Sequence, residues 1–140
     1  MEMQIKLYSN GSIPTRSHMG DCWDVRAAET VDYPAYKHFY ISLGFSAKLP
    51  HGYAAHIYPR SSTFAKYNVI FTNHVPIIDP TYCGDEDVWK LSLFSFAPGH
   101  IEQGSRIAQF EIVEQPPELE FKVVETLGAT NRGGFGSTGV

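Results

Sequence analysis

A carboxylate at the end of an apolar run is the strongest candidate for a catalytic group in this sequence. Residues 75–78 read Val-Pro-Ile-Ile, and Asp79 follows them directly before Pro80. Because proline disfavours the helical region for the residue before it, we expect Asp79 in extended backbone at the start of a turn. A carboxylate there could activate water as a general base, and Tyr82 could lie against a sugar or a base. The alternative is a structural aspartate whose side chain closes the turn.

A glycine-rich segment closes the sequence, and its few other side chains suit a nucleotide. It spans residues 128–140 and holds Arg132 and Phe135 among its glycines. Successive glycines let backbone N–H groups turn toward one anion, and an arginine can pair with two phosphate oxygens at once. A phenylalanine with no core to join could stack on a base. On composition alone, the alternative is a disordered terminus.

Two further segments carry polar groups where a strand meets a turn. Arg60 and the hydroxyls of Ser61 and Ser62 follow a predicted strand and precede a possible helix, a setting that suits phosphate. The alternative is a helix cap beside a surface arginine. Gln109 points away from Phe110 in the other segment, so its amide faces either solvent or a site.

Composition excludes several classes of protein. The chain has 140 residues, 43% hydrophobic and 19% charged, which is typical of one folded domain. Its net charge of −4 argues against DNA or RNA as the main partner, because nucleic-acid-binding domains carry a basic surplus. No apolar run approaches the roughly 18 residues of a membrane span, and the N-terminus does not resemble a signal peptide. We therefore expect no membrane partner. The two cysteines form no C-x-x-C pair, which favours a reducing, cytoplasmic location.

Short strands are the elements that must position these groups. Apolar and polar residues alternate in four segments, 3–7, 89–93, 108–112 and 121–125. This pattern, with β-formers over 38–49, predicts an all-β sandwich or barrel. One short helix could run over residues 63–67, capped by Ser61 or Ser62, and an irregular loop is the alternative.

Five segments in order give the sequence a family resemblance. They cover residues 22–27, 59–62, 73–84, 104–109 and 132–139. In these segments the chain resembles the trimeric dUTPases. The resemblance implies a jelly-roll-like β-barrel over residues 1–127 and a C-terminal lid over residues 128–140. It also implies a homotrimer with active sites between subunits, which hydrolyses dUTP to dUMP and pyrophosphate with Mg²⁺.

The same resemblance implies a role for each matching residue. Asp79 would orient and deprotonate the attacking water, and Tyr82 would pack under the deoxyribose. Uracil would be recognised by Asn73 and by the backbone near Ile77 and Ile78. The phosphates would be held by Arg60, Ser61, Ser62 and Gln109, and by Arg132, Gly136 and Ser137 of the lid, while Phe135 covers the base. Mg²⁺ would be bound mainly by substrate phosphates and water, with Asp24 as the protein carboxylate considered near it.

Some residues depart from the family pattern and leave alternatives open. Ser62 and Pro76 replace usual glycines, Ser105 replaces a usual aspartate, and Arg132 stands closer to Phe135 than in many members. A dCTP deaminase of the same fold is one alternative, which the Ser61–Ser62 pair favours. Tyr82 and the lack of a glutamate in residues 89–93 argue against it. Another is a nucleotide-gated protein-binding module with a regulatory protein partner, a role that can coexist with catalysis. A purely structural jelly roll leaves the glycine-rich tail unexplained.

Overall fold

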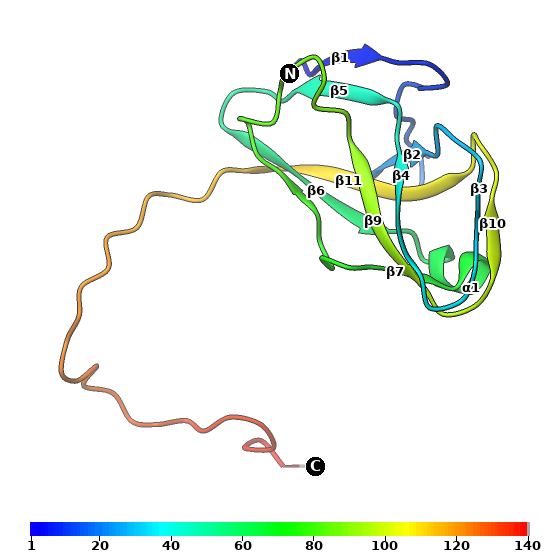
Figure 1. Cartoon of the computed structure of the whole chain (residues 1–140). Helices are drawn as coiled ribbons and strands as arrows, with labels where there is room; N and C mark the ends of the chain where they lie inside the picture. Colours follow the sequence, from blue (N-terminus) through cyan, green and yellow to red (C-terminus); the bar gives the residue numbers. More distant parts are fainter. Residues whose placement is uncertain (140) are drawn as a thin grey trace.

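The computed structural model describes residues 1–139, and almost all of its regular structure is β-strand. Eleven strands and one five-residue helix, α1 (Thr63–Tyr67), form a body from which the C-terminal segment departs (Figure 1). The prediction of an all-β fold with at most one short helix is confirmed. No helix within residues 1–139 has the length and apolar character to cross a membrane.

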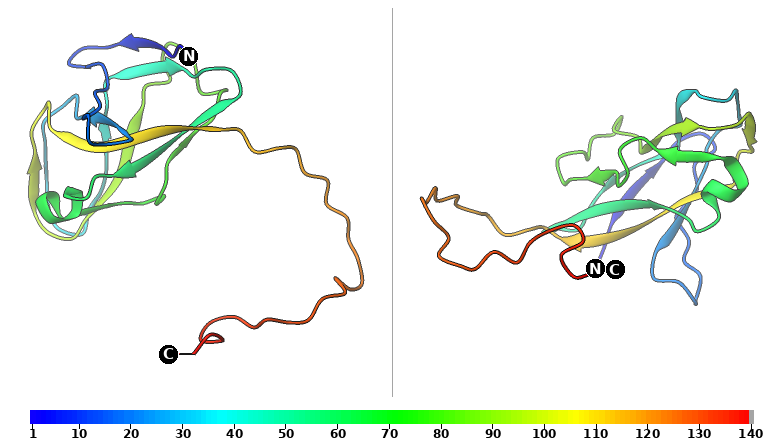
Figure 2. Two further views of the ribbon diagram at one scale, coloured as in Figure 1. Left: turned by 180° about the vertical axis from the view of Figure 1, so that it is seen from behind. Right: turned by 90° about the horizontal axis from the view of Figure 1, so that it is seen from below.

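All strand pairs are antiparallel and form four small sheets. The largest has the order β2 (Trp23–Arg26), β11 (Arg106–Glu114), β6 (Tyr53–Pro59), β8 (Ile77–Ile78). The second has the order β4 (His38–Ser42), β9 (Lys90–Ser95), β7 (Val69–Phe71). Two ribbons pair β1 (Gln4–Leu7) with β5 (Phe45–Lys48) and β3 (Val31–Tyr33) with β10 (Gly99–Ile101). Figure 2 shows these sheets wrapped around a common interior.

The core lies where three of these sheets meet. Trp89 is fully buried, and its ring packs 4.9 Å from the ring of Phe45 and 5.2 Å from that of Phe110, between ring centroids. Backbone hydrogen bonds hold Trp89 in place, because its N–H donates to the Phe45 carbonyl and its own carbonyl accepts from Leu43. The alternation predicted for residues 89–93 is present, with Leu91 and Leu93 buried and their neighbours facing outward.

Helix α1 is capped differently from the sequence prediction. Ser62 occupies the N-cap position, but neither it nor Ser61 makes a side-chain capping bond. The hydroxyl of Thr63 accepts the Arg60 N–H at 2.8 Å and lies 3.2 Å from the Ile107 carbonyl, so a tertiary contact replaces the local cap. This frees both serine hydroxyls from the helix.

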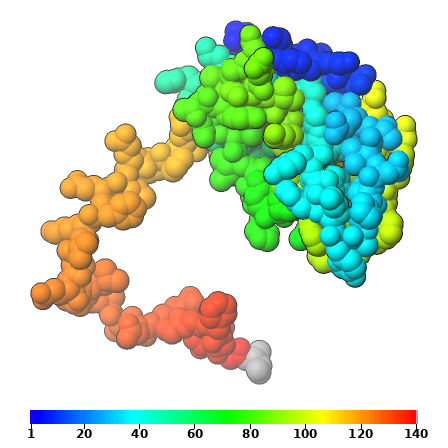
Figure 3. All heavy atoms as spheres, viewed as in Figure 1, coloured from blue at the N-terminus to red at the C-terminus, as the bar shows by residue number. Residues whose placement is uncertain are grey.

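The segment after β11 leaves the body without regular structure. Residues 115–139 contain no strand or helix, and they extend away from the sheets (Figures 1 and 3). The strand predicted over residues 121–125 is therefore wrong for the isolated chain, since no strand lies beside it. Phe121 and Val123 are 87% and 97% exposed. The last strand ends at Glu114, before the boundary predicted at residue 127, and Val140 of the predicted lid lies outside the described residues.

Replacing Trp89 tests how far the body depends on this aromatic cluster. Trp89→Ala should lower the free energy of unfolding by about 3–5 kcal/mol, because it leaves a cavity where the sheets meet. Trp89→Phe should cost less, since a ring stays between its neighbours and a buried indole N–H without a partner in the described structure disappears. Urea denaturation at one fixed protein concentration compares both. Equal losses would show that the ring does not hold the cluster together.

Candidate active site

The segment around Asp79 is attached to the central sheet by the two-residue strand β8. Ile77 and Ile78 pair with His56 and Ala55 of β6, and the Ile57 N–H donates to the Pro76 carbonyl at 2.9 Å. A pocket of about 290 Å³ opens beside this attachment. It is lined by Tyr40, Asn73, Pro76, Ile77, Ile78, Asp79, Tyr82, Lys90 and Ser92. The structure thus brings together all five residues that the sequence assigned to the catalytic base, the sugar and uracil.

Asp79 lies at the start of a turn, as its position before Pro80 predicts. Its Oδ1 accepts the Thr81 backbone N–H at 2.8 Å and also the Thr81 hydroxyl. The structural alternative for Asp79 is therefore correct as a description of the turn, and it is compatible with a catalytic role because Asp79 is exposed in the pocket. The hydrogen bond from the Thr81 hydroxyl, with that from the Thr81 backbone, holds the pKa of Asp79 below its usual value. The carboxylate is therefore ionised at neutral pH.

Tyr82 forms the floor beside Asp79. Its hydroxyl donates to the Val88 carbonyl at 3.0 Å, and its ring packs against the core while still lining the pocket. Burial raises the pKa of the phenol, and the nearby Asp87 carboxylate raises it further, so Tyr82 stays neutral. A neutral, fixed ring is suited to pack against a sugar.

Sequence reasoning missed three residues of the pocket, which come from β4 and β9. Tyr40 and Ser92 are register partners in these strands, and the Lys90 ammonium lies 5.4 Å from the centroid of the Tyr40 ring. The period of two placed Lys90 and Ser92 on one face. Their place in the pocket depends on the pairing of β4 with β9, and that pairing has no local signal in the sequence.

A second group of predicted residues surrounds Asp24. Strand β11 pairs with both β2 and β6, which places Gln109 opposite Asp24 on one side and Tyr58 on the other. The Arg60 Nε donates to Asp24 Oδ1 at 3.0 Å, and Arg106 Nη1 lies 3.5 Å from Asp24 Oδ2. One carboxylate therefore faces two guanidinium groups and leaves the cluster with a net positive charge.

The remaining polar groups near Asp24 belong to the turn after β6. Gln109 donates from its side-chain amide to the Pro59 carbonyl at 3.1 Å, and exposed Ser61 and half-buried Ser62 follow Arg60. A positive cluster beside hydroxyl groups can bind an anion such as phosphate. Arg106 belongs to the segment 104–109 that carries the family resemblance, but nothing in the sequence predicted its ion pair with Asp24.

The lid residues meet neither group within one chain. Arg132, Phe135, Gly136 and Ser137 are all exposed in the segment that extends from the body (Figure 3). Gly133 and Gly136 have φ values of 94° and 77°, which glycine adopts readily, and the Ser137 N–H closes a turn on the Gly134 carbonyl at 2.9 Å. The predicted site residues therefore form three groups in this chain: the pocket, the Asp24 cluster and the lid.

The side chains present offer few ligands for a metal ion. Within residues 1–139, no group of three or more His, Cys, Asp or Glu side chains is arranged to hold one. Both oxygens of Asp24 face arginines, so direct ligation by Asp24 would displace one of them. Mg²⁺ commonly keeps several waters and binds through substrate phosphates with one or two carboxylates. This donor set fits an ion that arrives with a phosphorylated ligand.

Comparison with known proteins identifies the family. The dUTPase family model matches residues 9–139. The SPbeta prophage-derived deoxyuridine 5'-triphosphate nucleotidohydrolase YosS of Bacillus subtilis (strain 168) is 40% identical over 140 residues, which cover 98% of this chain and 99% of that protein. The deoxyuridine 5'-triphosphate nucleotidohydrolase of Corynebacterium diphtheriae is 37% identical and covers 91% and 86%. The solved structure of Staphylococcus bacteriophage 80alpha dUTPase with dUPNHPP has a TM-score of 0.80 and 28% identity over 99% of both chains. The chain belongs to the dUTPase family.

Proposed function

We propose that this protein hydrolyses dUTP to dUMP and pyrophosphate, with Mg²⁺ bound to the substrate phosphates. The observation that carries the proposal is the convergence of an ionised Asp79 with Asn73, Ile77, Ile78 and Tyr82 on one pocket. A carboxylate beside a nucleoside-sized hollow suits attack by water on a nucleotide. Membership of the dUTPase family supports the choice of substrate.

The reaction needs one base and several groups that stabilise charge. Asp79 accepts a proton from water as the water oxygen forms a bond to the α-phosphorus. The bond from that phosphorus to the bridging oxygen then breaks, and the electron pair leaves with pyrophosphate. Arg60 and the hydroxyls of Ser61 and Ser62 bind the phosphate oxygens on which charge is spread, together with Gln109. When bound, Mg²⁺ neutralises part of the phosphate charge.

The pocket supports selection of a deoxyuridine over other nucleosides. Backbone groups near Ile77 and Ile78 and the Asn73 amide would pair with the edge of uracil. Cytosine reverses one donor and one acceptor on that edge, so it would leave buried polar groups without partners. The Tyr82 ring would pack under the deoxyribose and exclude a 2′-hydroxyl. A dCTP deaminase finds less support, because the side chains that β9 places in the pocket are Lys90 and Ser92, and neither is a glutamate.

The detached lid supports an assembly in which one copy completes the site of another. Arg132 and Phe135 lie outside both groups of their own chain in this structure, so we place them over the site of a neighbouring subunit in a homotrimer. An acidic protein must concentrate positive charge where the triphosphate binds, and Arg132 would add to Arg60 there.

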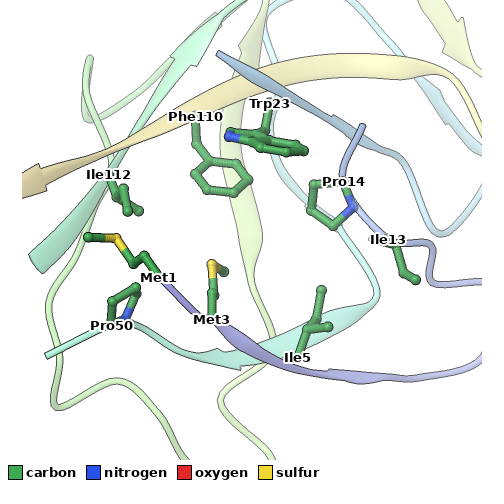
Figure 4. A pocket seen from close by; sticks show the side chains of 9 residues that line it. All are labelled: Met1, Met3, Ile5, Ile13, Pro14, Trp23, Pro50, Phe110 and Ile112. Carbon is green, nitrogen blue, oxygen red and sulfur yellow. The ribbon is translucent and has the colours of Figure 1, made fainter. Parts of the chain in front are cut away.

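An open apolar pocket offers the same tail a place to pack. It measures about 400 Å³ and is lined by Met1, Met3, Ile5, Ile13, Pro14, Trp23, Pro50, Phe110 and Ile112 (Figure 4). Beside it, β1 pairs only with β5 among the described strands, so one of its edges is free. The exposed Leu119, Phe121 and Val123 of a neighbouring tail alternate as a strand on that edge would require. This contact would supply the partner that the predicted strand lacks.

A second candidate role concerns regulation. Phage dUTPases such as that of bacteriophage 80alpha are described as controlling transfer of virulence genes by a proto-oncogenic G protein-like mechanism. We keep a nucleotide-gated contact with a regulatory protein partner as this candidate. An exposed tail that orders on a nucleotide would suit it, and the cytoplasm is the compartment we expect for both roles.

Pyrophosphate release from dUTP, dCTP, dTTP and UTP, each with Mg²⁺, tests the proposed reaction. Release from dUTP alone is the expected result, because the proposed site recognises the uracil edge, a sugar without a 2′-hydroxyl and the phosphates at the same time. Ammonia from dCTP would assign the protein to the deaminase reaction instead. Binding of dUTP with no product from any nucleotide would favour the nucleotide-gated role.

Asp79→Asn tests the base. The variant should bind dUTP with nearly unchanged affinity and should lose about 10²–10⁴-fold in kcat, since the amide keeps the shape but cannot take the proton. Steady-state kinetics and calorimetric titration with a non-hydrolysable dUTP analogue measure the two quantities. Asp85→Asn, at an exposed aspartate outside the pocket, is the matched control. Near-normal turnover in Asp79→Asn would remove Asp79 from the reaction.

Deletion of residues 131–140 tests the lid. We expect turnover to fall while the oligomer persists, because Leu119, Phe121 and Val123 remain in the shortened chain. Sedimentation velocity at several protein concentrations measures assembly, and pyrophosphate release measures activity. A monomeric product would show that the last ten residues hold the subunits together.

A further inference from the structure

One oxygen of the Asp79 carboxylate is already occupied. Both hydrogen bonds to Oδ1 come from Thr81, one from its backbone N–H and one from its hydroxyl. No hydrogen bond from a side chain within residues 1–139 ends on Oδ2, and the Tyr82 backbone N–H, which donates to the Asp79 carbonyl at 3.1 Å, is the one further donor that contributes to the lowered pKa of the carboxylate. The carboxylate therefore presents two unlike oxygens, one fixed to its own turn and one available to water.

Thr81 is the only residue whose side chain forms a hydrogen bond with the Asp79 carboxylate among the described residues. Asp79 stands between the pocket described above and a second hollow of about 500 Å³, which Thr81 also lines. The other titratable groups around these hollows are Lys48 at the end of β5, His51 before β6, Tyr40 from β4, Tyr82 from the same turn, and Lys90 from β9. None of these five side chains forms an ion pair or a hydrogen bond with the Asp79 carboxylate in the described structure.

We propose that Thr81 is a positioning residue for the reaction, which holds Asp79 Oδ1 so that Oδ2 takes the proton from water. This inference rests on the proposed hydrolysis and adds a specific role to the turn. An exposed aspartate samples several rotamers, whereas a base must keep its oxygen in line with the water and the phosphorus. Two donors on one oxygen fix both the rotamer and the plane of the carboxylate.

The sequence of the turn makes Thr81 suited to this task. Pro80 lies between Asp79 and Thr81, and its ring fixes its own φ angle. The turn therefore has fewer conformations open to it. The β-branched side chain of Thr81 is stiff about χ1, so its hydroxyl is held in place without any contact from another element. Serine offers the same hydroxyl with more freedom, and valine offers the same shape with no hydroxyl.

These two substitutions separate orientation from shape. Thr81→Val should reduce kcat for dUTP about tenfold at neutral pH and leave KM within about twofold, because binding contacts are unchanged while the base loses its alignment. The loss at neutral pH reports orientation alone, since the carboxylate remains ionised there in both proteins. Thr81→Ser should restore most of kcat.

The pH profile gives an independent readout. Hydrogen bonds to the charged form keep the pKa of Asp79 low, and the hydroxyl of Thr81 is the first of them. Removing that hydroxyl raises the pKa, and because the ionised form is active, the acid limb of kcat/KM should move to higher pH in Thr81→Val. In Thr81→Ser the limb should lie close to that of the original protein.

Thr30→Val is the matched control, because Thr30 is also exposed and its hydroxyl also accepts a backbone N–H, from Gln103 just beyond the end of β10. It should leave both kcat and the acid limb unchanged. The proposal is overturned if Thr81→Val keeps the kcat and acid limb of the original protein, or if Thr81→Ser fails to restore them. A lack of dUTP hydrolysis in the unsubstituted protein is a different result, and it would overturn the proposed function itself.

Discussion

The pairing of the two-residue strand β8 with β6 is the contact on which the site depends. Two residues of ladder are weak by themselves, but β6 is flanked on its other side by the nine-residue strand β11. Ala55 and Ile57 of β6 are fully buried, so the strand that receives β8 is held by the core. The turn at Asp79 thereby takes its position from a strand buried in the core, although the turn itself is exposed.

The charged groups of the second cluster are organised around one carboxylate, that of Asp24. Asp24 is largely shielded from solvent, with a side chain only 13% exposed, and an unpaired carboxylate there would be costly. Arg60 and Arg106 neutralise it and leave one positive charge over. Because Asp24 fixes the Arg60 side chain before any ligand arrives, the guanidinium loses less freedom when it meets a phosphate. In the function that we propose, this preorganisation would help a protein of net charge −4 to bind a polyanion at one place.

Much of this molecule could be predicted from local signals, and the misses have a common cause. The turn at Asp79 follows from Pro80, which restricts the backbone of its neighbour, and the strand that contains Gln109 follows from simple alternation. Ser62 occupies the predicted N-cap position of α1 but makes no side-chain capping bond, and the Thr63 hydroxyl instead donates to the carbonyl of Ile107, a residue far along the chain. The Asp24 ion pairs and the place of Lys90 depend on strand register between distant segments. Side-chain alternation says which residues share a face, but not which strand lies opposite.

The tail shows the same limit at the level of the assembly. Residues 121–125 have the alternation that predicted a strand, yet one chain supplies no neighbouring strand for them. A free edge on β1, an apolar pocket beside it and a lid without a site in its own chain are the surfaces that a second copy would cover in the assembly that we propose. The information for the strand is thus present in the sequence, and its partner is not part of the same chain. An exposed Phe121 has no stabilising role in the monomer, whereas burial of such a ring contributes about 1.5–3 kcal/mol. The apolar residues along this exposed tail therefore fit the assembly that we propose, in which the tail would tie subunits together and bring the glycine-rich lid to a neighbouring site.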